Sequence, residues 1–324
     1  MPILANEHHD RLFILIRYST PMKKHSSLRI VATLAVLAAC SRPVATSAPT
    51  SQPAAASGAP KHMLFRAHGP KGATVYMLGS VHLLSPDVAT LPSVVDTAFT
   101  HAKLIAFETS LDTIQMRATE MLSRSRYSGG ATLRTSLSPK AIAHLDTVLK
   151  AYGLTVDQVN GFKPWFVSVL TTQLVMQRMK FEAKYGVDMQ LNARAHTANM
   201  PIVGLESVDF QMGLFDSILP ADQEKMILEA NGPDSSVRSM TRIKDAWVAG
   251  NVAGLDSLLN AGMVSSPAMF ATMVTNRNRS WIPKIDEMLK GKDDALVVVG
   301  AAHLVGKQGV IEMLRAKGYK IEQM

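Results

Sequence analysis

The sequence predicts an α/β fold that is rich in helix, with a central mixed sheet built from two similar halves. Four short apolar runs are typical of strands buried on both faces: Ala73–Gly79, Lys103–Glu108, Pro201–Glu206 and Ala295–Gly300. Long segments with the apolar spacing of helices lie between them. The first and last runs lead into the same Gly-x-x-His-Leu pattern, at Gly79–Leu83 and Gly300–Leu304, which favours two related halves.

The N-terminal 39 residues are typical of a secretory signal segment. Two lysines and Arg29 follow Met22 and precede an apolar stretch from Ile30 to Ala39. As a helix this stretch would be about 15 Å long, half of a bilayer core, so it is too short to span a membrane. Because Met22 opens a complete signal by itself, residues 1–21 are expected to be an upstream extension from a misplaced start codon.

Cys40 ends the sequence Leu37-Ala38-Ala39-Cys40, which resembles a bacterial lipobox. Such a cysteine becomes lipidated and N-terminal after cleavage, and several acyl chains would bind the protein firmly to a membrane. Ser41 stands where an aspartate would indicate inner-membrane retention, so we expect the outer membrane, facing the periplasm. The alternative is a plain secretory signal with an unrelated cysteine. A single cysteine excludes an internal disulfide and a thiolate zinc site.

Residues 41–60 consist almost entirely of Ser, Pro, Ala, Thr and Gly and are expected to form a flexible tether. The folded α/β domain is then residues 61–324. The whole chain has 34 basic and 26 acidic residues, a net charge of +8, but residues 1–39 contain five basic residues against two acidic ones. The domain is therefore less basic than the whole chain, and we expect no nucleic-acid partner.

Helices are expected to outnumber strands in the domain. Ser138 and Pro139 are typical of an N-cap and first helical residue, and Gly153 of a helix end, which predicts a helix over 139–152. Residues 164–181 predict a largely buried helix. Further helices are expected over 220–231, 235–249 and 266–290.

Two histidines and two glutamates end the four predicted strands: His82, Glu108, Glu206 and His303. In open α/β sheets, ligand sites form at the carboxyl ends of the strands. A glycine three residues before each histidine would let the chain turn off the strand and approach a ligand closely. Each residue alone is more typical of a structural role, but the four together favour a shared site.

Two other kinds of site are weakly supported. The helix-borne zinc motif H-E-x-x-H is absent. Ser80 lies two residues from His82, but we expect the two to point to opposite faces of an extended segment, and no triad is evident.

The domain resembles the TraB/GumN family, which is related to the Tiki proteins and more distantly to the erythromycin-esterase and ChaN-like folds. The resemblance covers nearly all of 64–324. It rests on paired motifs at Leu78–His82 and Val299–Gly309, and on Ala106-Phe107-Glu108, Lys163-Pro164-Trp165, Tyr185-Gly186-Val187-Asp188, Gly204-Leu205-Glu206, Trp247 with Gly250, Arg277-Asn278-x-x-Trp281 and Gly318-Tyr319. One departure is Thr109, where the family often has a second acid after Glu108.

This resemblance implies a fold of two similar halves and a metal-dependent hydrolase, with peptide-bond cleavage known for Tiki relatives. It implies that His82 and His303 are metal ligands and that Glu108 and Glu206 are site residues. A peptide or small-molecule substrate is expected, and its identity does not follow from the family.

The mechanism follows as a hypothesis. His82, Glu206 and His303 would bind a divalent metal (Mn, Co or Zn), and metal-bound water would ionise near neutral pH. Glu108 would act as the base, although the two glutamates could exchange roles. Arg277 would stabilise the oxyanion, or else pair with a structural acid. Asp188 and Asn278 are candidates for hydrogen-bonding to the metal ligands and orienting them, and Asp188 could equally be a structural acid at a helix start.

Two other classes of function stay open. The runner-up is a non-catalytic envelope lipoprotein in which His82 and His303 bind haem or a metal. The third is an interaction protein whose helical surface meets envelope partners. In each case the membrane would be contacted through the lipid at Cys40.

Overall fold

The computed structural model describes residues 61–260 and 266–324. The predicted signal segment 1–39 and the predicted tether with Cys40 lie outside these residues. Within the described ranges, no helix combines the length and the apolar character needed to cross a membrane.

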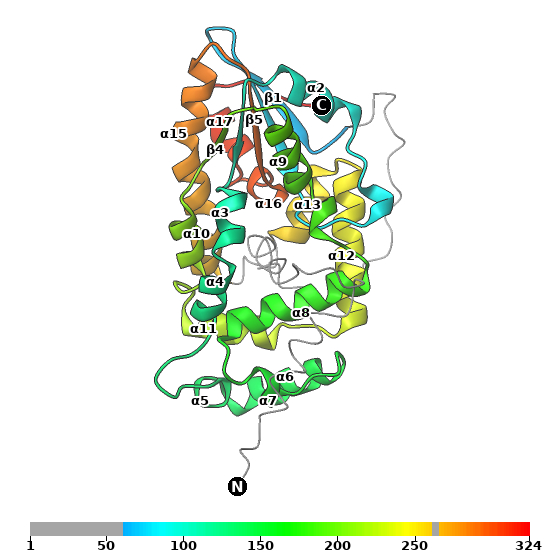
Figure 1. Ribbon diagram of the computed structural model, residues 1–324, viewed down its shortest axis with the longest axis vertical. Helices are drawn as coiled ribbons and strands as arrows, with labels where there is room; N and C mark the ends of the chain where they lie inside the picture. The colour runs from blue at the N-terminus through cyan, green and yellow to red at the C-terminus, as the bar shows by residue number, and fades with distance from the viewer. Residues whose placement is uncertain (1–60, 261–265) are drawn as a thin grey trace.

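A six-stranded mixed sheet forms the upper half of the molecule in Figure 1, which confirms the α/β class. Its strands are β1 (Leu64–His68), β2 (Thr74–Ser80), β3 (Leu104–Phe107), β4 (Ile202–Gly204), β5 (Ala295–Gly300) and β6 (Ile321–Gln323). Their order is β4-β3-β5-β2-β1-β6. The first four in this order are mutually parallel, whereas β1 pairs antiparallel with both β2 and β6.

The two strands that precede the Gly-x-x-His sequences lie side by side. Every residue of β2 and β5 is buried, as near-continuous apolar runs predict for a sheet covered on both faces. Gly79 pairs with Val299 and Ser80 with Gly300, so the two repeated sequences start one residue apart in the register of the two strands. Beyond these pairs the chain paths differ: β5 continues into the short helix α16 (Ala301–Leu304), and β2 into an irregular segment before η2 (Pro86–Val88).

Two strands, β1 and β6, have no counterpart in the sequence prediction. β6 has three residues, and β1 includes the partly exposed Arg66 and the exposed His68, so neither contains a long apolar run. Arg66 pairs with Glu322 across the two strands at 2.8 Å. Such strands take their place from pairing with neighbours that are distant in sequence, which no local pattern shows.

The predicted helices are all present. They are α6 (Pro139–Lys150), α8 (Pro164–Arg178), α11 (Pro220–Leu228), α12 (Pro233–Val248) and, for 266–290, the succession of α14 (Pro267–Phe270), a π-helical turn η4 (Ala271–Thr275) and α15 (Asn276–Lys290). The Ser138 side chain accepts a hydrogen bond from the Ala141 N–H, as an N-cap does. The remaining described helices are α2 (Ser93–His101), α3 (Leu111–Met116), α4 (Ala118–Arg124), α5 (Leu133–Ser136), α7 (Val156–Val159), η3 (Ala183–Tyr185), α9 (Val187–Thr197), α10 (Val208–Leu214), α13 (Val252–Leu259) and α17 (Val310–Ala316).

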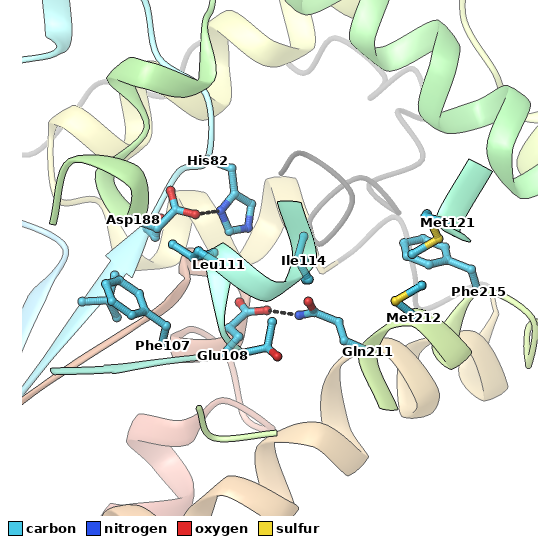
Figure 2. A pocket seen from close by; sticks show the side chains of 13 residues that line it. His82, Phe107, Glu108, Leu111, Ile114, Met121, Asp188, Gln211, Met212 and Phe215 are labelled. Atoms are coloured by element: carbon cyan, nitrogen blue, oxygen red, sulfur yellow. Dashed lines mark hydrogen bonds and ion pairs between the residues drawn. The ribbon is translucent and has the colours of Figure 1, made fainter. Parts of the chain in front are cut away.

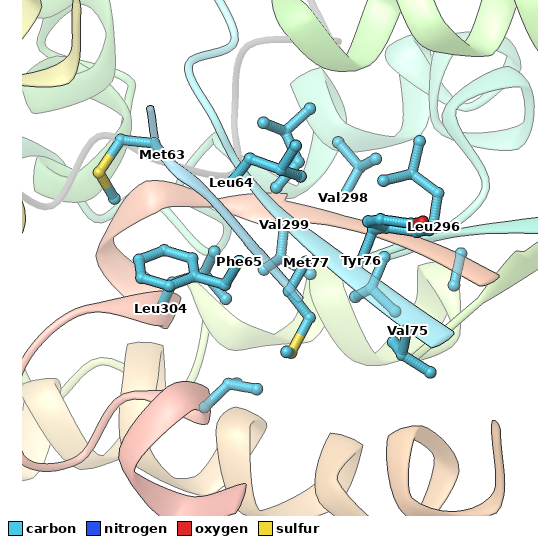
Figure 3. Close-up of a cluster of buried hydrophobic side chains, with 14 of the residues drawn as sticks. Met63, Leu64, Phe65, Val75, Tyr76, Met77, Leu296, Val298, Val299 and Leu304 are labelled. Carbon is cyan, nitrogen blue, oxygen red and sulfur yellow. The ribbon is translucent and has the colours of Figure 1, made fainter. Parts of the chain in front are cut away.

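Two hydrophobic clusters matter for the site. The sheet cluster surrounds β1, β2 and β5, where Figure 3 shows Val75, Met77 and Leu296 among packed neighbours. A second group, which we call the helical cluster, lies among the helices below the sheet in Figure 1. Its buried members are Ile114, Met121, Trp165, Val169, Val208, Met212, Leu214, Phe215, Ile218, Met226, Met269, Met273 and Val274.

Candidate functional site

The carboxyl ends of β2, β3, β4 and β5 meet at one edge of the sheet, because these four strands are parallel neighbours. The four candidate residues follow these ends, with His303 on the short helix α16. His82 is 8% exposed, Glu108 5% and His303 4%, and the Glu206 side chain is buried as well. Four ionisable side chains are thus buried together at this edge of the sheet.

Arg277 lies in the middle of this environment, with 1% of its surface exposed. It reaches the sheet edge from α15, directly after the π-helical turn. Its guanidinium donates to Glu108 and to Glu206, with the shortest contact to each at 2.6 Å. Further hydrogen bonds go to the Met273 carbonyl at 3.2 Å and to Nε2 of His303 at 3.0 Å. These contacts occupy all five of its N–H groups, so Arg277 is a buried cation with no N–H group left for a further hydrogen bond.

Glu108 accepts hydrogen bonds on both of its oxygens. The backbone N–H of Gly300 donates to Oε1 at 2.7 Å, and Gln211 donates to Oε2 at 3.1 Å, beside Arg277. Burial raises the pKa of Glu108, but the charge of Arg277 and the other nearby donors outweigh burial and lower this pKa to about 2. Glu108 is therefore a carboxylate at neutral pH, with its lone pairs largely engaged.

Glu206 is bound in a similar way. Arg277 Nε lies 3.1 Å from each oxygen of this carboxylate, and the indole N–H of Trp281 donates to Oε2 at 3.1 Å. Gln211 donates to Oε1 at 3.2 Å and so bridges the two glutamates. Arg277 and Trp281 are four residues apart on α15 and therefore share one helix face, which explains the spacing of this motif.

His303 is neutral and oriented from both sides. Arginine can only donate, so Nε2 accepts from Arg277 and Nδ1 carries the proton that is donated to Asn278 Oδ1 at 2.6 Å. Burial and the neighbouring Arg277 charge lower the pKa of His303 to about 3. Asn278 also donates to the backbone carbonyls of His303 and Gln308, which fixes the short helix α16 against α15.

His82 belongs to a separate arrangement at the same edge. Its Nδ1 lies 2.6 Å from Oδ2 of Asp188, which is in the first turn of α9. A helix start favours a negative charge at that place. The Val187 N–H donates to the Val81 carbonyl at 3.1 Å. Gly186 lies so close that an added Cβ would be 2.1 Å from the His82 carbonyl oxygen. The Tyr185–Asp188 motif therefore binds the backbone and the side chain of the segment after β2.

The other ring nitrogen of His82 has no hydrogen-bond partner among the described residues, although it is buried. Burial lowers the pKa of His82, but the charge and hydrogen bond of Asp188, together with Glu108, outweigh burial and leave this pKa above its ordinary value of about 6.5. With Nδ1–H donating to Asp188, the neutral ring presents a basic lone pair at Nε2.

A pocket lies between this edge of the sheet and the helices α3 and α10 (Figure 2). Four of the buried polar atoms that lack a partner in the described structure belong to residues that line it: Ser80 Oγ, His82 Nε2, Thr109 Oγ1 and Asp188 Oδ1. Buried polar groups are rarely left without a hydrogen bond. A concentration of them in one pocket indicates that a polar ligand or water binds there.

The predicted metal ligands do not fit a shared ion in this arrangement. Nε2 of His303 and both oxygens of Glu206 accept hydrogen bonds from Arg277, so their lone pairs face a cation already. Over the described ranges, no group of three or more His, Cys, Asp and Glu side chains is arranged to hold a metal. Of the three predicted ligands, only His82 has a donor atom, Nε2, that is free of hydrogen bonds within the described structure.

Two features of the pocket differ from what the sequence suggested. Ser80 and His82 both line it, so the expectation that they point to opposite faces is wrong: residues two apart in an extended chain share a face. Gln211 was missed altogether. The sequence feature that could have indicated it is a glutamine on the apolar face of α10, between Val208 and Met212, because a buried amide needs polar partners.

The chain is similar to known proteins. The model of the TraB/PrgY/gumN family matches residues 63–323. The uncharacterized protein YbaP of Escherichia coli (strain K12) and that of Shigella flexneri are each 21% identical to the chain over 242 residues, which is 74% of this chain and 87% of theirs. No solved structure matches significantly. Because the family model spans the sheet, the buried arginine network and the pocket, the chain belongs to the TraB/PrgY/gumN family.

Proposed function

We propose that the protein is a hydrolase of amide bonds in the cell envelope and that His82 is its general base. The observation that supports this role is the orientation of the imidazole: Nδ1 is bonded to Asp188, and Nε2 is buried, without a partner, in a pocket. A base must have a lone pair directed at the reacting group and a partner that fixes its tautomer. The His82–Asp188 pair meets both requirements.

The reaction follows from the groups in the pocket. Nε2 of His82 accepts a proton from water as the water attacks the carbonyl carbon, and Asp188 stabilises the imidazolium that forms. The hydroxyls of Ser80 and Thr109 are the unused donors that can bind the developing oxyanion. The imidazolium then returns the proton to the leaving amine.

Glu108 fits the role of base less well than His82. Both of its oxygens accept hydrogen bonds, and its pKa is lowered to about 2, which makes it a poor proton acceptor near neutral pH. Its negative charge instead helps to raise the pKa of His82. The base proposed from the sequence is therefore replaced by His82.

Arg277 fits a positioning role better than the oxyanion role. Its five N–H groups are used within the protein, so none is left for a substrate oxygen. The alternative interpretation of the sequence, an arginine paired to structural acids, describes these contacts. We propose that Arg277 keeps Glu108, Glu206 and His303 in place at the sheet edge.

The dependence on metal stays a prediction. Because the proposed ligand set does not fit an ion here, no step above uses one, and Mn, Co and Zn are equally open. Elemental analysis of purified protein, together with activity after chelation, tests this prediction. Activity that is lost on chelation and restored by one of these ions would require Glu206 and His303 to exchange Arg277 for the metal.

The test of the proposal is a pair of substitutions assayed on a library of fluorogenic peptide amides. His82→Ala and Asp188→Asn should each lower kcat by a factor of about 10²–10⁴, the usual contribution of a general base. In the wild type, kcat/KM should rise with pH to a half-maximum above about 6.5, because the base acts only when neutral.

The chain offers a matched control on α9. His196 and Asp112 form a second His–Asp pair at 2.8 Å, but both side chains are more than half exposed. His196→Ala should leave kcat and its pH profile unchanged. Full activity in His82→Ala would contradict the proposal.

A place in the envelope is part of this proposal. It rests on the lipobox-like sequence at Cys40, which lies outside the described residues, and on the preceding signal-like stretch. The substrate would then be a peptide or small molecule of the periplasm.

A further inference from the structure

The pocket beside His82 has one polar end and one apolar end. Figure 2 shows Met121, Met212 and Phe215 grouped on the side away from His82 and Asp188, with Ile114 between. These four side chains come from α4, from α10 and its end, and from α3. The ionisable residues that line the pocket are His82, Glu108 and Asp188, so none belongs to the apolar end.

The residues that line the apolar end belong to the helical cluster, which is rich in methionine. Five of the thirteen buried members of the helical cluster are methionines, against two of thirty-eight in the sheet cluster. Methionine is unbranched and polarisable and adapts its shape to what packs against it, which is why it recurs at apolar binding surfaces. The wall of the pocket can therefore adjust to a flexible apolar group.

The polar end matches an amide group. The unpartnered hydroxyls of Ser80 and Thr109 can donate to a carbonyl oxygen, and His82 Nε2 and Asp188 Oδ1 can accept from an amide N–H. An amide would thus satisfy buried atoms that the protein leaves unpaired. A charged group at the other end would lose its hydration without gaining a partner.

We infer that the substrate is an amide with an unbranched apolar chain next to the reacting carbonyl, and that the Met121–Met212–Phe215 end of the pocket binds this chain. The inference deepens the proposed function and rests on it for the position of the carbonyl. It concerns binding, so it can be tested without turnover.

The test is the affinity of the purified protein for straight-chain primary carboxamides of increasing length, from acetamide upward, measured by calorimetry. While the chain lengthens inside the apolar end, each methylene should tighten binding about fourfold, the gain expected for burying one CH₂. The gain should stop once the end is filled. Affinity that does not change with chain length would overturn the inference.

Two substitutions of the same kind locate the chain. Met212 and Met226 are both buried members of the helical cluster, but only Met212 lines the pocket. Met212→Ala should move the plateau to longer amides, because it lengthens the space. Met226→Ala should leave the plateau where it is, with a comparable loss of stability recorded by thermal melting. The same plateau in wild type and Met212→Ala would show that the chain binds elsewhere and would overturn the inference.

The binding profile also separates this inference from the proposed function. His82→Ala should keep the chain-length dependence while it loses turnover, because His82 contacts only the amide end. A wild type that binds long amides tightly but hydrolyses no amide would refute the hydrolase and leave the ligand class standing. A wild type that hydrolyses amides with no preference for chain length would support the hydrolase and overturn the inference about the apolar chain.

Discussion

At the residue scale, the guanidinium of Arg277 lies between the buried carboxylates of Glu108 and Glu206, and among the described residues it is the only Lys or Arg side chain that contacts them. Glu108 and Glu206 would each lose this partner in the absence of the guanidinium, while neutral His303 would lose a donor. A buried charge without a partner costs several kcal/mol, which makes this residue more important for folding than its neighbours on α15.

Arg277→Met should therefore destabilise the protein by about 3–5 kcal/mol, because it leaves two carboxylates uncompensated. Arg279→Met is the control, since Arg279 is exposed on the same helix and its loss should change stability by less than about 0.5 kcal/mol. Urea unfolding followed by circular dichroism measures both. Equal losses in the two variants would mean that the buried network is not the stabilising feature.

His303 should make the protein sensitive to mild acid. Its pKa is about 3 in the folded protein and about 6.5 when unfolded, so between these values only the unfolded chain takes up the proton. Stability from this residue is complete above pH about 6.5 and falls by up to about 1.4 kcal/mol for each unit below it. The raised pKa of His82 acts in the opposite direction.

The contribution of His303 is isolated by comparing variants. The free energy of unfolding should fall less steeply between about pH 7 and pH 5 in His303→Gln than in wild type. His101→Gln, a change at an exposed histidine on α2, should keep the wild-type slope. A slope in His303→Gln that matches wild type would show that this imidazole does not resist protonation in the fold.

At the element scale, the start of α9 is what brings Asp188 to His82. Gly186 is the N-cap residue of this helix, and the helix begins at Val187, whose N–H binds the Val81 carbonyl. The close approach of Gly186 to the His82 backbone leaves no room for a side chain. The position of the His82–Asp188 pair thus depends on the absence of a side chain at Gly186, where the helix starts.

Gly186→Ala should push α9 away from the segment after β2 and lengthen the Nδ1–Asp188 contact of His82. We expect a loss of activity similar to that of Asp188→Asn, and a loss of stability of about 1–3 kcal/mol, typical of overpacking. Gly232→Ala is the control, because Gly232 is also an N-cap with a similar backbone but has nothing within 4 Å of an added Cβ. Equal activity in the two variants would contradict this role for α9.

At the scale of the whole molecule, the two ends of the described chain meet at the edge of the sheet opposite β4. The His62 N–H donates to the Met324 carbonyl at 2.6 Å, and β1 pairs with β6 beside it. The pocket is formed instead at the carboxyl ends of β2 and β3. Lys61 therefore leads into β1, which lies between β2 and β6, and none of the residues from Lys61 to His68 lines the pocket.

The proposed lipid anchor can be tested by changing the single cysteine. Cys40→Ser should release the protein from the membrane fraction into the soluble periplasm, because the acyl chains would be absent. Immunoblots of fractionated cells measure the distribution, and amide hydrolysis by the released protein should match wild type. Protein that stays in the membrane fraction after Cys40→Ser would contradict the lipobox interpretation.

The sequence by itself predicted the α/β class, four strands and the main helices, because buried parallel strands and amphipathic helices leave local patterns. It also predicted that His82, Glu108, Glu206 and His303 would meet, since the carboxyl ends of parallel strands share an edge. Short strands such as β1 and β6 left no such pattern, because their pairing is with residues distant in the chain.

Only the tertiary structure decided that Glu108, Glu206 and His303 share one hydrogen-bond network while His82 belongs to another. Arg277 contacts Glu108, Glu206 and His303, whereas Asp188 contacts His82, and all of these contacts join segments that are distant in the chain. The residue types at the strand ends do not specify which residue contacts which. The same holds for Gln211 and for the apolar end of the pocket, which combine α3, α4 and α10 with the sheet. A hydrogen bond or a desolvated charge depends on distances of a few ångströms between distant segments, and those distances exist only once the chain has folded.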